Sequence, residues 1–100
     1  MVILKSEKAV EEVDLDIRYE YSYRLTENLY DNVKAYGIEA ERLLFKAEEL
    51  KDVERESINL ISPIYSKVEE MLNLIYKHKV SPVHVIDILG EKVDECVLDF

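Results

Sequence analysis

The sequence has few of the residues that build well-defined functional motifs. It holds one cysteine, Cys96, which excludes an internal disulfide and a thiol-based zinc cage within one chain. Its only glycines, Gly37 and Gly90, lie far apart, so no glycine-rich loop can cradle a phosphate. The longest apolar run covers residues 1–4, whereas a membrane-spanning helix needs about 20. The same start lacks the basic region and long apolar core of a signal peptide, and we therefore expect a cytoplasmic protein.

Basic side chains are scarce as well. The 100 residues include 22 acidic and 13 basic side chains, a net charge of −9, and residues 1–32, 33–61 and 62–100 are each net acidic. Clustered lysines and arginines supply most of the affinity of nucleic-acid-binding proteins, so we expect no nucleic-acid partner. The same charge repels an anionic membrane surface. Hydrophobic residues make up 48% of the chain, which predicts one packed domain over residues 1–100.

A run of alternating residues gives the clearest strand signal. Apolar or aromatic side chains occupy every second position from Val13 to Leu25, with polar ones between them. Side chains of a strand point alternately to its two faces, so this pattern predicts a strand with one apolar face. Tyr19, Tyr21 and Tyr23 form an aromatic stripe on that face. We interpret the stripe as core beneath helices, because a surface that stacks nucleic-acid bases needs lysines and arginines around it.

Turn-prone residues follow this strand. The segments 26–28 (Thr-Glu-Asn) and 31–32 (Asp-Asn) each predict a turn. A second strand is predicted from Val33 onward, and Gly37 in its middle predicts a bulge or a close approach of another backbone.

Two segments stay open at this point. Residues 1–12 are polar after Leu4 and show no clear period, so they form either a mobile arm or a short extra strand. Residues 41–56 favour a helix by composition. The alternative is a hairpin that turns near residues 47–49 and continues as a third strand over about 50–58.

The last third predicts two helices. Ser62-Pro63 and Ser81-Pro82 each place a capping hydroxyl before a proline that suits the first helical position. An apolar stripe at helical spacing follows each signal. The first stripe contains Ile64, Val68, Met71, Leu72, Ile75 and Tyr76, and the second contains Val85, Leu89, Val93 and Cys96. The short connection predicts a helical hairpin over residues 62–97.

Four segments carry a family resemblance. They are Tyr36-Gly37-Ile38-Glu39, Glu54 to Ser62, Lys67-Val68-Glu69-Glu70 and Val80 to Gly90. Together they resemble a family of short proteins from spore-forming, clostridia-type Firmicutes that is known only as a domain of unknown function. The resemblance covers about residues 17–100. It implies a β-turn within residues 43–52, and on that ground we favour three strands over a helix at 41–56.

These features predict an α+β fold in which a small antiparallel β-meander of two to three strands packs against a C-terminal helical hairpin. Residues 13–58 are the strand-rich part, and 62–97 hold the two helices. The expected core contains Ile17, Tyr19, Tyr21, Tyr23, Ile38, Val68, Leu72, Ile75, Val85, Leu89 and Val93.

No arrangement of residues predicts catalysis, and we expect no enzyme and no cofactor. The best pair, Cys96 and His84, would lie about 18 Å apart on one helix, too far for a nucleophile and its base. His84, Asp87 and Glu91 share one helical face and are the only candidate metal ligands, although helical faces carry such trios by chance.

The leading hypothesis is therefore a non-catalytic cytoplasmic adaptor or regulator that binds another protein. A small-molecule-binding or metal-binding domain is the alternative, and an acidic inhibitor that mimics nucleic acid is a weaker one. A homodimer through an open strand edge is compatible with the sequence.

Overall fold

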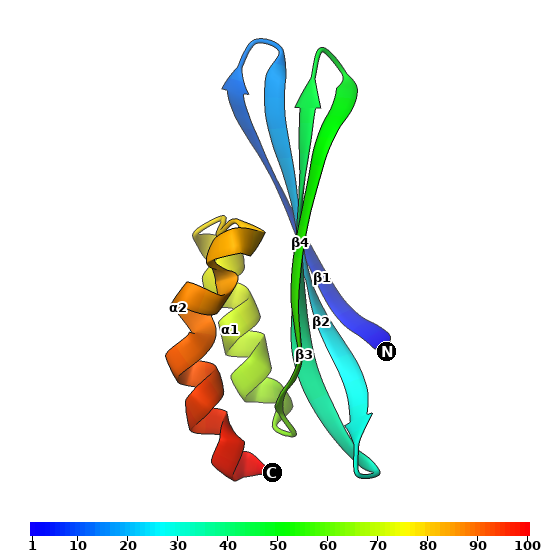
Figure 1. The fold of residues 1–100 in the computed structure, drawn as a ribbon, viewed down its shortest axis with the longest axis vertical. Helices are drawn as coiled ribbons and strands as arrows, with labels where there is room; N and C mark the ends of the chain where they lie inside the picture. Colours follow the sequence, from blue (N-terminus) through cyan, green and yellow to red (C-terminus); the bar gives the residue numbers. More distant parts are fainter.

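Four strands of nearly equal length follow one another as an antiparallel meander. The structure, a computed structural model, describes residues 1–100. Its sheet has the order β1-β2-β3-β4, and both helices lie on one face of it (Figure 1). The elements are β1 (Val2–Asp14), β2 (Ile17–Tyr30), β3 (Val33–Lys46), β4 (Glu49–Ser62), α1 (Tyr65–Lys77), α2 (Pro82–Glu95) and the 3₁₀ helix η1 (Cys96–Asp99). The α+β prediction is confirmed, with four strands rather than two to three.

The fourth strand comes from the beginning of the chain. Residues 1–12 are not a mobile arm, because β1 pairs with β2 from Val2 to Asp14. The extra strand left open above is therefore present, and it is long. It escaped the periodicity argument because β1 is an edge strand, whose burial pattern contains no buried residue. Its helix-side residues are only half-buried, so polar side chains are tolerated there and the sequence does not alternate between apolar and polar residues.

The predicted limits of the following strand were wrong at both ends. Leu15 and Asp16 form a turn between β1 and β2, and Leu15 is 99% exposed. The side chain of Asp14 accepts a hydrogen bond from the Leu15 amide at 2.7 Å, a contact that favours a turn. At the other end, residues 26–28 continue β2, and only Asp31-Asn32 form the predicted turn.

Residues 41–56 form a hairpin, so the three-strand interpretation is confirmed there and the helical one is wrong. The turn lies at Ala47 and Glu48, whose φ angles are 51° and 66°. A type I′ hairpin turn has positive φ at both central positions and therefore favours Asn-Gly. Ala-Glu is an unfavourable pair in this conformation, which explains why composition pointed to a helix. Continuous pairing of β3 with β2 and β4 outweighs that local preference.

Replacing the unfavourable turn residues should stabilise the protein. We expect the double variant Ala47→Asn/Glu48→Gly to raise the free energy of unfolding by about 1 kcal/mol, because it removes the strain of positive φ. The measurement is urea denaturation followed by circular dichroism. Asn32→Gly, in the turn between β2 and β3, is the control. It should raise the free energy of unfolding less, since Asn already tolerates its φ of 64°. An equal gain in both turns would contradict this explanation.

Gly37 confirms the predicted close backbone approach. A Cβ atom at this position would overlap the backbone of Ile58 and Asn59 on β4. The register between β3 and β4 shifts at the same place. Only glycine, which has no Cβ atom, allows β3 and β4 to approach each other this closely.

Both helices were predicted, and one of the two start signals was wrong. The second holds in position, because Ser81 is the N-cap residue of α2 and Pro82 occupies its first turn, but the Ser81 hydroxyl makes no capping hydrogen bond. The first does not, since α1 begins at Tyr65 with Ile64 as its N-cap residue. The Ser62 hydroxyl instead accepts a hydrogen bond from the Ile64 amide at 3.0 Å and donates one to Asp99 at 3.0 Å. Ser62 thus ties the start of α1 to the end of the chain.

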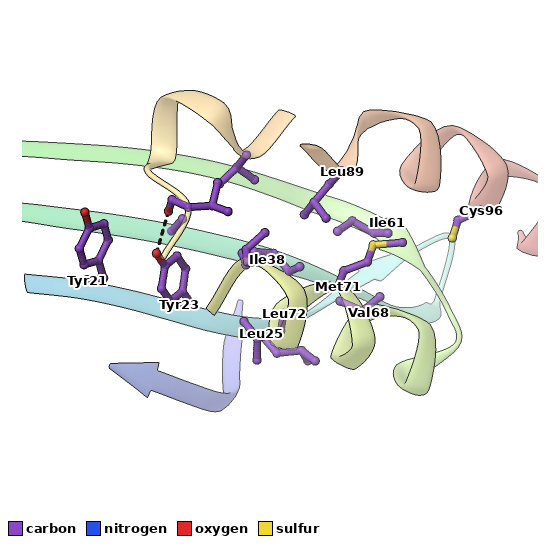
Figure 2. Close-up of a cluster of buried hydrophobic side chains, with 14 residues drawn as sticks. Tyr21, Tyr23, Leu25, Ile38, Ile61, Val68, Met71, Leu72, Leu89 and Cys96 are labelled. Carbon is purple, nitrogen blue, oxygen red and sulfur yellow. Dashed lines mark hydrogen bonds between the residues drawn. The ribbon is translucent and has the colours of Figure 1, made fainter. Parts of the chain in front are cut away.

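The core lies between the helices and the lower half of the sheet (Figures 1 and 2). Most of the expected core residues are buried there, and Ile17, Tyr19 and Val93 are only half-buried. The core cluster contains Tyr21, Tyr23, Leu25, Ile38, Ala40, Ile61, Val68, Met71, Leu72, Ile75, Val80, Val85, Leu89 and Cys96. Cys96 is a small core residue, as the sequence predicted.

Tyr23 lies near the upper limit of this core, next to Tyr21 at its border. Its hydroxyl donates a 2.7 Å hydrogen bond to the backbone carbonyl of Val80, in the connection between the helices (Figure 2). Burial raises the pKa of Tyr23 well above its ordinary value, so the hydroxyl keeps its proton. The bond fixes the helix connection to the sheet.

We expect Tyr23→Phe to destabilise the protein by about 1–3 kcal/mol, because the buried carbonyl of Val80 would lose its partner. Thermal and urea unfolding measure the change. Tyr36→Phe is a suitable control, since Tyr36 packs edge-on against Tyr65 and donates no such buried bond. Equal losses in both variants would show that the Val80 contact adds nothing specific.

Candidate functional site

The helices are much shorter than the sheet. A strand of 14 residues spans about 46 Å and a helix of 14 residues about 21 Å, and the molecule is 47 Å long. The helices therefore cover only the lower half of one face, and the turns at residues 15–16 and 47–48 project beyond them (Figure 1). We call residues 9–21 and 42–54 the free end of the sheet.

The register of the sheet defines which residues share the face of the free end that continues from the core. One row across the four strands contains Glu11, Tyr19, Leu44 and Asp52, and the next contains Ala9, Tyr21, Arg42 and Glu54. Tyr21 is 4% exposed and marks the border of the core, while Tyr19 beyond it is half-buried. The aromatic stripe of β2 thus runs from the core out onto an uncovered surface.

Arg42 orders this surface. Its guanidinium carbon lies 4.4 Å from the ring centre of Tyr19, and its Nη2 donates to both carboxylate oxygens of Glu54 at 2.8 Å. Burial alone would lower the pKa of Arg42, and the hydrogen bonds to Glu54 outweigh it, so the net change is upward. Cation, ring and carboxylate hold one another in place, and little side-chain entropy remains to be lost when a partner binds.

The opposite face of the free end repeats this pattern. The guanidinium carbon of Arg18 lies 4.4 Å from the ring centre of Phe45, and Arg18 donates to Glu20 at 3.0 Å and to Glu48 at 2.8 Å. Figure 1 shows no helix on this face. The free end therefore presents an arginine stacked on an aromatic ring on both of its sides.

The free end also carries much of the protein's charge. Its 26 residues include nine acidic and four basic side chains, a net charge of −5 of the total of −9. A basic partner is attracted to such a surface, and attraction of this kind weakens as salt rises.

The three candidate metal ligands lie elsewhere, on the outer side of α2. His84 Nδ1 is 3.7 Å from Asp87 Oδ2, and both side chains are well exposed, as is Glu91. The structure contains no group of three or more His, Cys, Asp or Glu side chains placed to hold a metal ion. Metal binding by His84, Asp87 and Glu91 stays a prediction.

A thermal-shift screen with divalent cations tests it. A site would give a rise of the unfolding midpoint that His84→Ala abolishes, because a bound metal stabilises the folded state. His78→Ala, at the exposed end of α1, is the matched control and should keep the rise. No rise with any cation would remove the hypothesis.

A hollow lies between α1 and α2. It has a volume of about 370 Å³ and is lined by Lys67, Glu70, Met71, Leu74, Lys92, Glu95 and Cys96. Burial, together with the charge of Asp99, raises the pKa of the Cys96 thiol. A protonated, buried thiol is a poor nucleophile, which agrees with the core role of Cys96.

Sequence reasoning missed the free end almost entirely. Arg42 and Glu54 fall in the segment whose structure was left open, and Tyr19 was assigned to the core. The one available signal was that the stripe of alternating residues is longer than a short helix can cover.

The fold defines the class of this molecule: a small α+β protein with a four-stranded antiparallel meander and two C-terminal helices on one face. No helix is long and apolar enough to cross a membrane. The chain belongs to the family of unknown function DUF6514, whose model matches residues 1–95. This finding agrees with the expected membership of an uncharacterised family. Neither the curated proteins nor the solved structures contain a match to the chain.

Proposed function

We propose that this protein is a non-catalytic adaptor or regulator in the cytoplasm, and that it binds another protein through the free end of its sheet. The observation that carries the proposal is the uncovered surface built by Tyr19, Arg42 and Glu54, which the fold holds rigid and leaves without a partner of its own.

The residue types support a protein as the ligand. Tyrosine and arginine are enriched among the residues that contribute most to binding at protein interfaces. Here the ring of Tyr19 is already stacked and Arg42 is already paired, so binding does not have to order them. The negative charge of the free end favours a basic partner surface.

The test is capture of partners from a lysate of the host organism. Wild-type protein and Tyr19→Ala are immobilised and compared at low and high salt, with mass spectrometry of the captured proteins. We expect one protein near stoichiometric amounts with the wild type and a reduction of about tenfold or more with Tyr19→Ala, as for a residue central to an interface.

Tyr30→Ala is the matched control. Tyr30 lies at the opposite end of β2, is 48% exposed and packs edge-on against Phe100. It should leave capture unchanged, provided that circular dichroism shows both variants folded. Loss of capture with Tyr30→Ala but not with Tyr19→Ala would place the binding surface at the end of the molecule opposite to the free end and contradict the proposal. Absence of any specific partner in all growth phases would remove the adaptor proposal itself.

A further inference from the structure

We propose that the open edge of β4 receives an extended basic segment of the partner as a fifth strand. This inference rests on the protein-binding function proposed above, and it adds the site and the chemistry of the bound segment. β4 is the last strand in the sheet order, so the backbone groups on its outer side have no strand beside them. Such an edge is a template for strand addition.

The outward-pointing amides of β4 can be identified from their hydrogen bonds. The pairing of β4 with β3 is regular over residues 52–58, with irregularities on either side. Within this stretch the Val53 amide donates to Asp52 Oδ1 at 2.9 Å, and the Ser57 amide donates to Glu56 Oε1 at 3.2 Å. Both amides therefore bind side chains of their own strand rather than β3. Two side chains cap the edge while it is empty.

The amide of Arg55 belongs to the same set. Backbone groups alternate in direction along a strand, so Arg55 points outward together with Val53 and Ser57. An added strand can bind all three positions through its own carbonyl and amide groups. It would displace the carboxylates of Asp52 and Glu56 from the amides that they cap, and each amide would exchange one acceptor for another.

The displaced carboxylates select the charge of the segment. Asp52, Glu54 and Glu56 alternate along β4 and face the same side as Leu44, Arg42 and Ala40 of β3. An extended segment with lysine or arginine at every second position would place one cation beside each carboxylate. Opposite charges directly across two strands stabilise their pairing.

A hollow beside this edge can receive one of the cationic side chains. It has a volume of about 470 Å³ and is lined by Val53, Glu54, Arg55, Glu56, Pro82 and Val83. Val83, in the first turn of α2, is 66% exposed. The aliphatic stem of a lysine can pack on Val83 while its ammonium group reaches Glu56.

The other edge offers no such complement. On the corresponding side, β1 presents Lys5, Glu7 and Glu11, and Lys5 already lies 3.4 Å from Glu69 of α1. The cations of an added basic segment would face Lys5 there and be repelled by it. A second copy of this chain does not suit the β4 edge either, because its acidic row would face the same acidic row.

The experiment uses the full chain and the peptide acetyl-Thr-Lys-Val-Lys-Val-Lys-Thr-amide as the probe. Amide hydrogen exchange is measured by NMR with and without saturating peptide. We expect the exchange rates of the Val53, Arg55 and Ser57 amides to fall by about tenfold or more in the complex, while those of β1 stay unchanged. The same peptide with an N-methyl group on every backbone amide, which keeps its charge and loses its donors, should not bind.

Matched double variants separate the edge from general attraction. Asp52→Asn/Glu56→Gln removes two charges from β4 and keeps oxygens that can cap the amides. Glu7→Gln/Glu11→Gln removes two charges from β1. The first should weaken peptide binding by about tenfold, and the second by about twofold or less.

Equal weakening by both variants, slowed exchange along β1, or undiminished binding of the N-methylated peptide would each overturn the inference. Slowed exchange at β4 that grows with protein concentration and needs no peptide would also overturn it, because a second copy would then occupy the edge. If the peptide does not bind while capture of the native partner still depends on Tyr19, the edge inference fails and the proposed function stands. If the peptide binds at the β4 edge but no native partner is captured, the proposed function fails and strand addition at the edge stands.

Discussion

A residue advances the chain about 3.3 Å in a strand and only about 1.5 Å in a helix, and this difference governs the whole molecule. Helices of 13 and 14 residues cannot cover strands of 13 and 14 residues. The buried core is therefore confined to one end of the sheet and ends at Tyr21, just beyond the contact between Tyr23 and Val80. Beyond that contact the free end is held by backbone pairing, by arginines stacked on rings and by cross-strand ion pairs. The part of the sheet that the helices leave uncovered can therefore serve as a binding surface without an additional domain.

The parts of the fold that could be predicted from the sequence are those where one face is covered. The stripes of α1 and α2 and the alternation through Tyr21 and Tyr23 each reflect burial on one side, and the structure confirms them except at Ile64, which precedes α1 and is 40% exposed. The helix-side face of β1 is only half-buried and carries Lys5, Glu7 and Glu11 beside Ala9, so its apolar and polar residues do not alternate. Leu15 fits the alternation and is nevertheless 99% exposed, because a two-residue turn interrupts the strand there. Periodicity reports burial and only indirectly secondary structure.

The candidate site was harder to predict because its geometry depends on register. Tyr19 and Arg42 are 23 positions apart in the sequence, and only the pairing of β2 with β3 places them in contact. Arg42 and Glu54 are paired by β3 and β4, and the turn between these strands, Ala47-Glu48, lacks the residues by which such turns are usually recognised. The acidic residues of β4 were equally consistent with a solvated helix. Local composition reveals neither the register between two strands nor which amides of an edge strand point outward.

Acidity and an open edge have a common physical basis in this protein. An uncovered strand edge invites association with other copies, and proteins limit this with charges and irregular pairing. β4 has both, since its pairing shifts on either side of residues 52–58 and its acidic row repels an identical row. Asp52 and Glu56 further occupy two of the outward amides. These caps are contacts between neighbouring residues of one strand, so an added strand can displace them. The same acidic row disfavours pairing with an identical row and favours a basic segment.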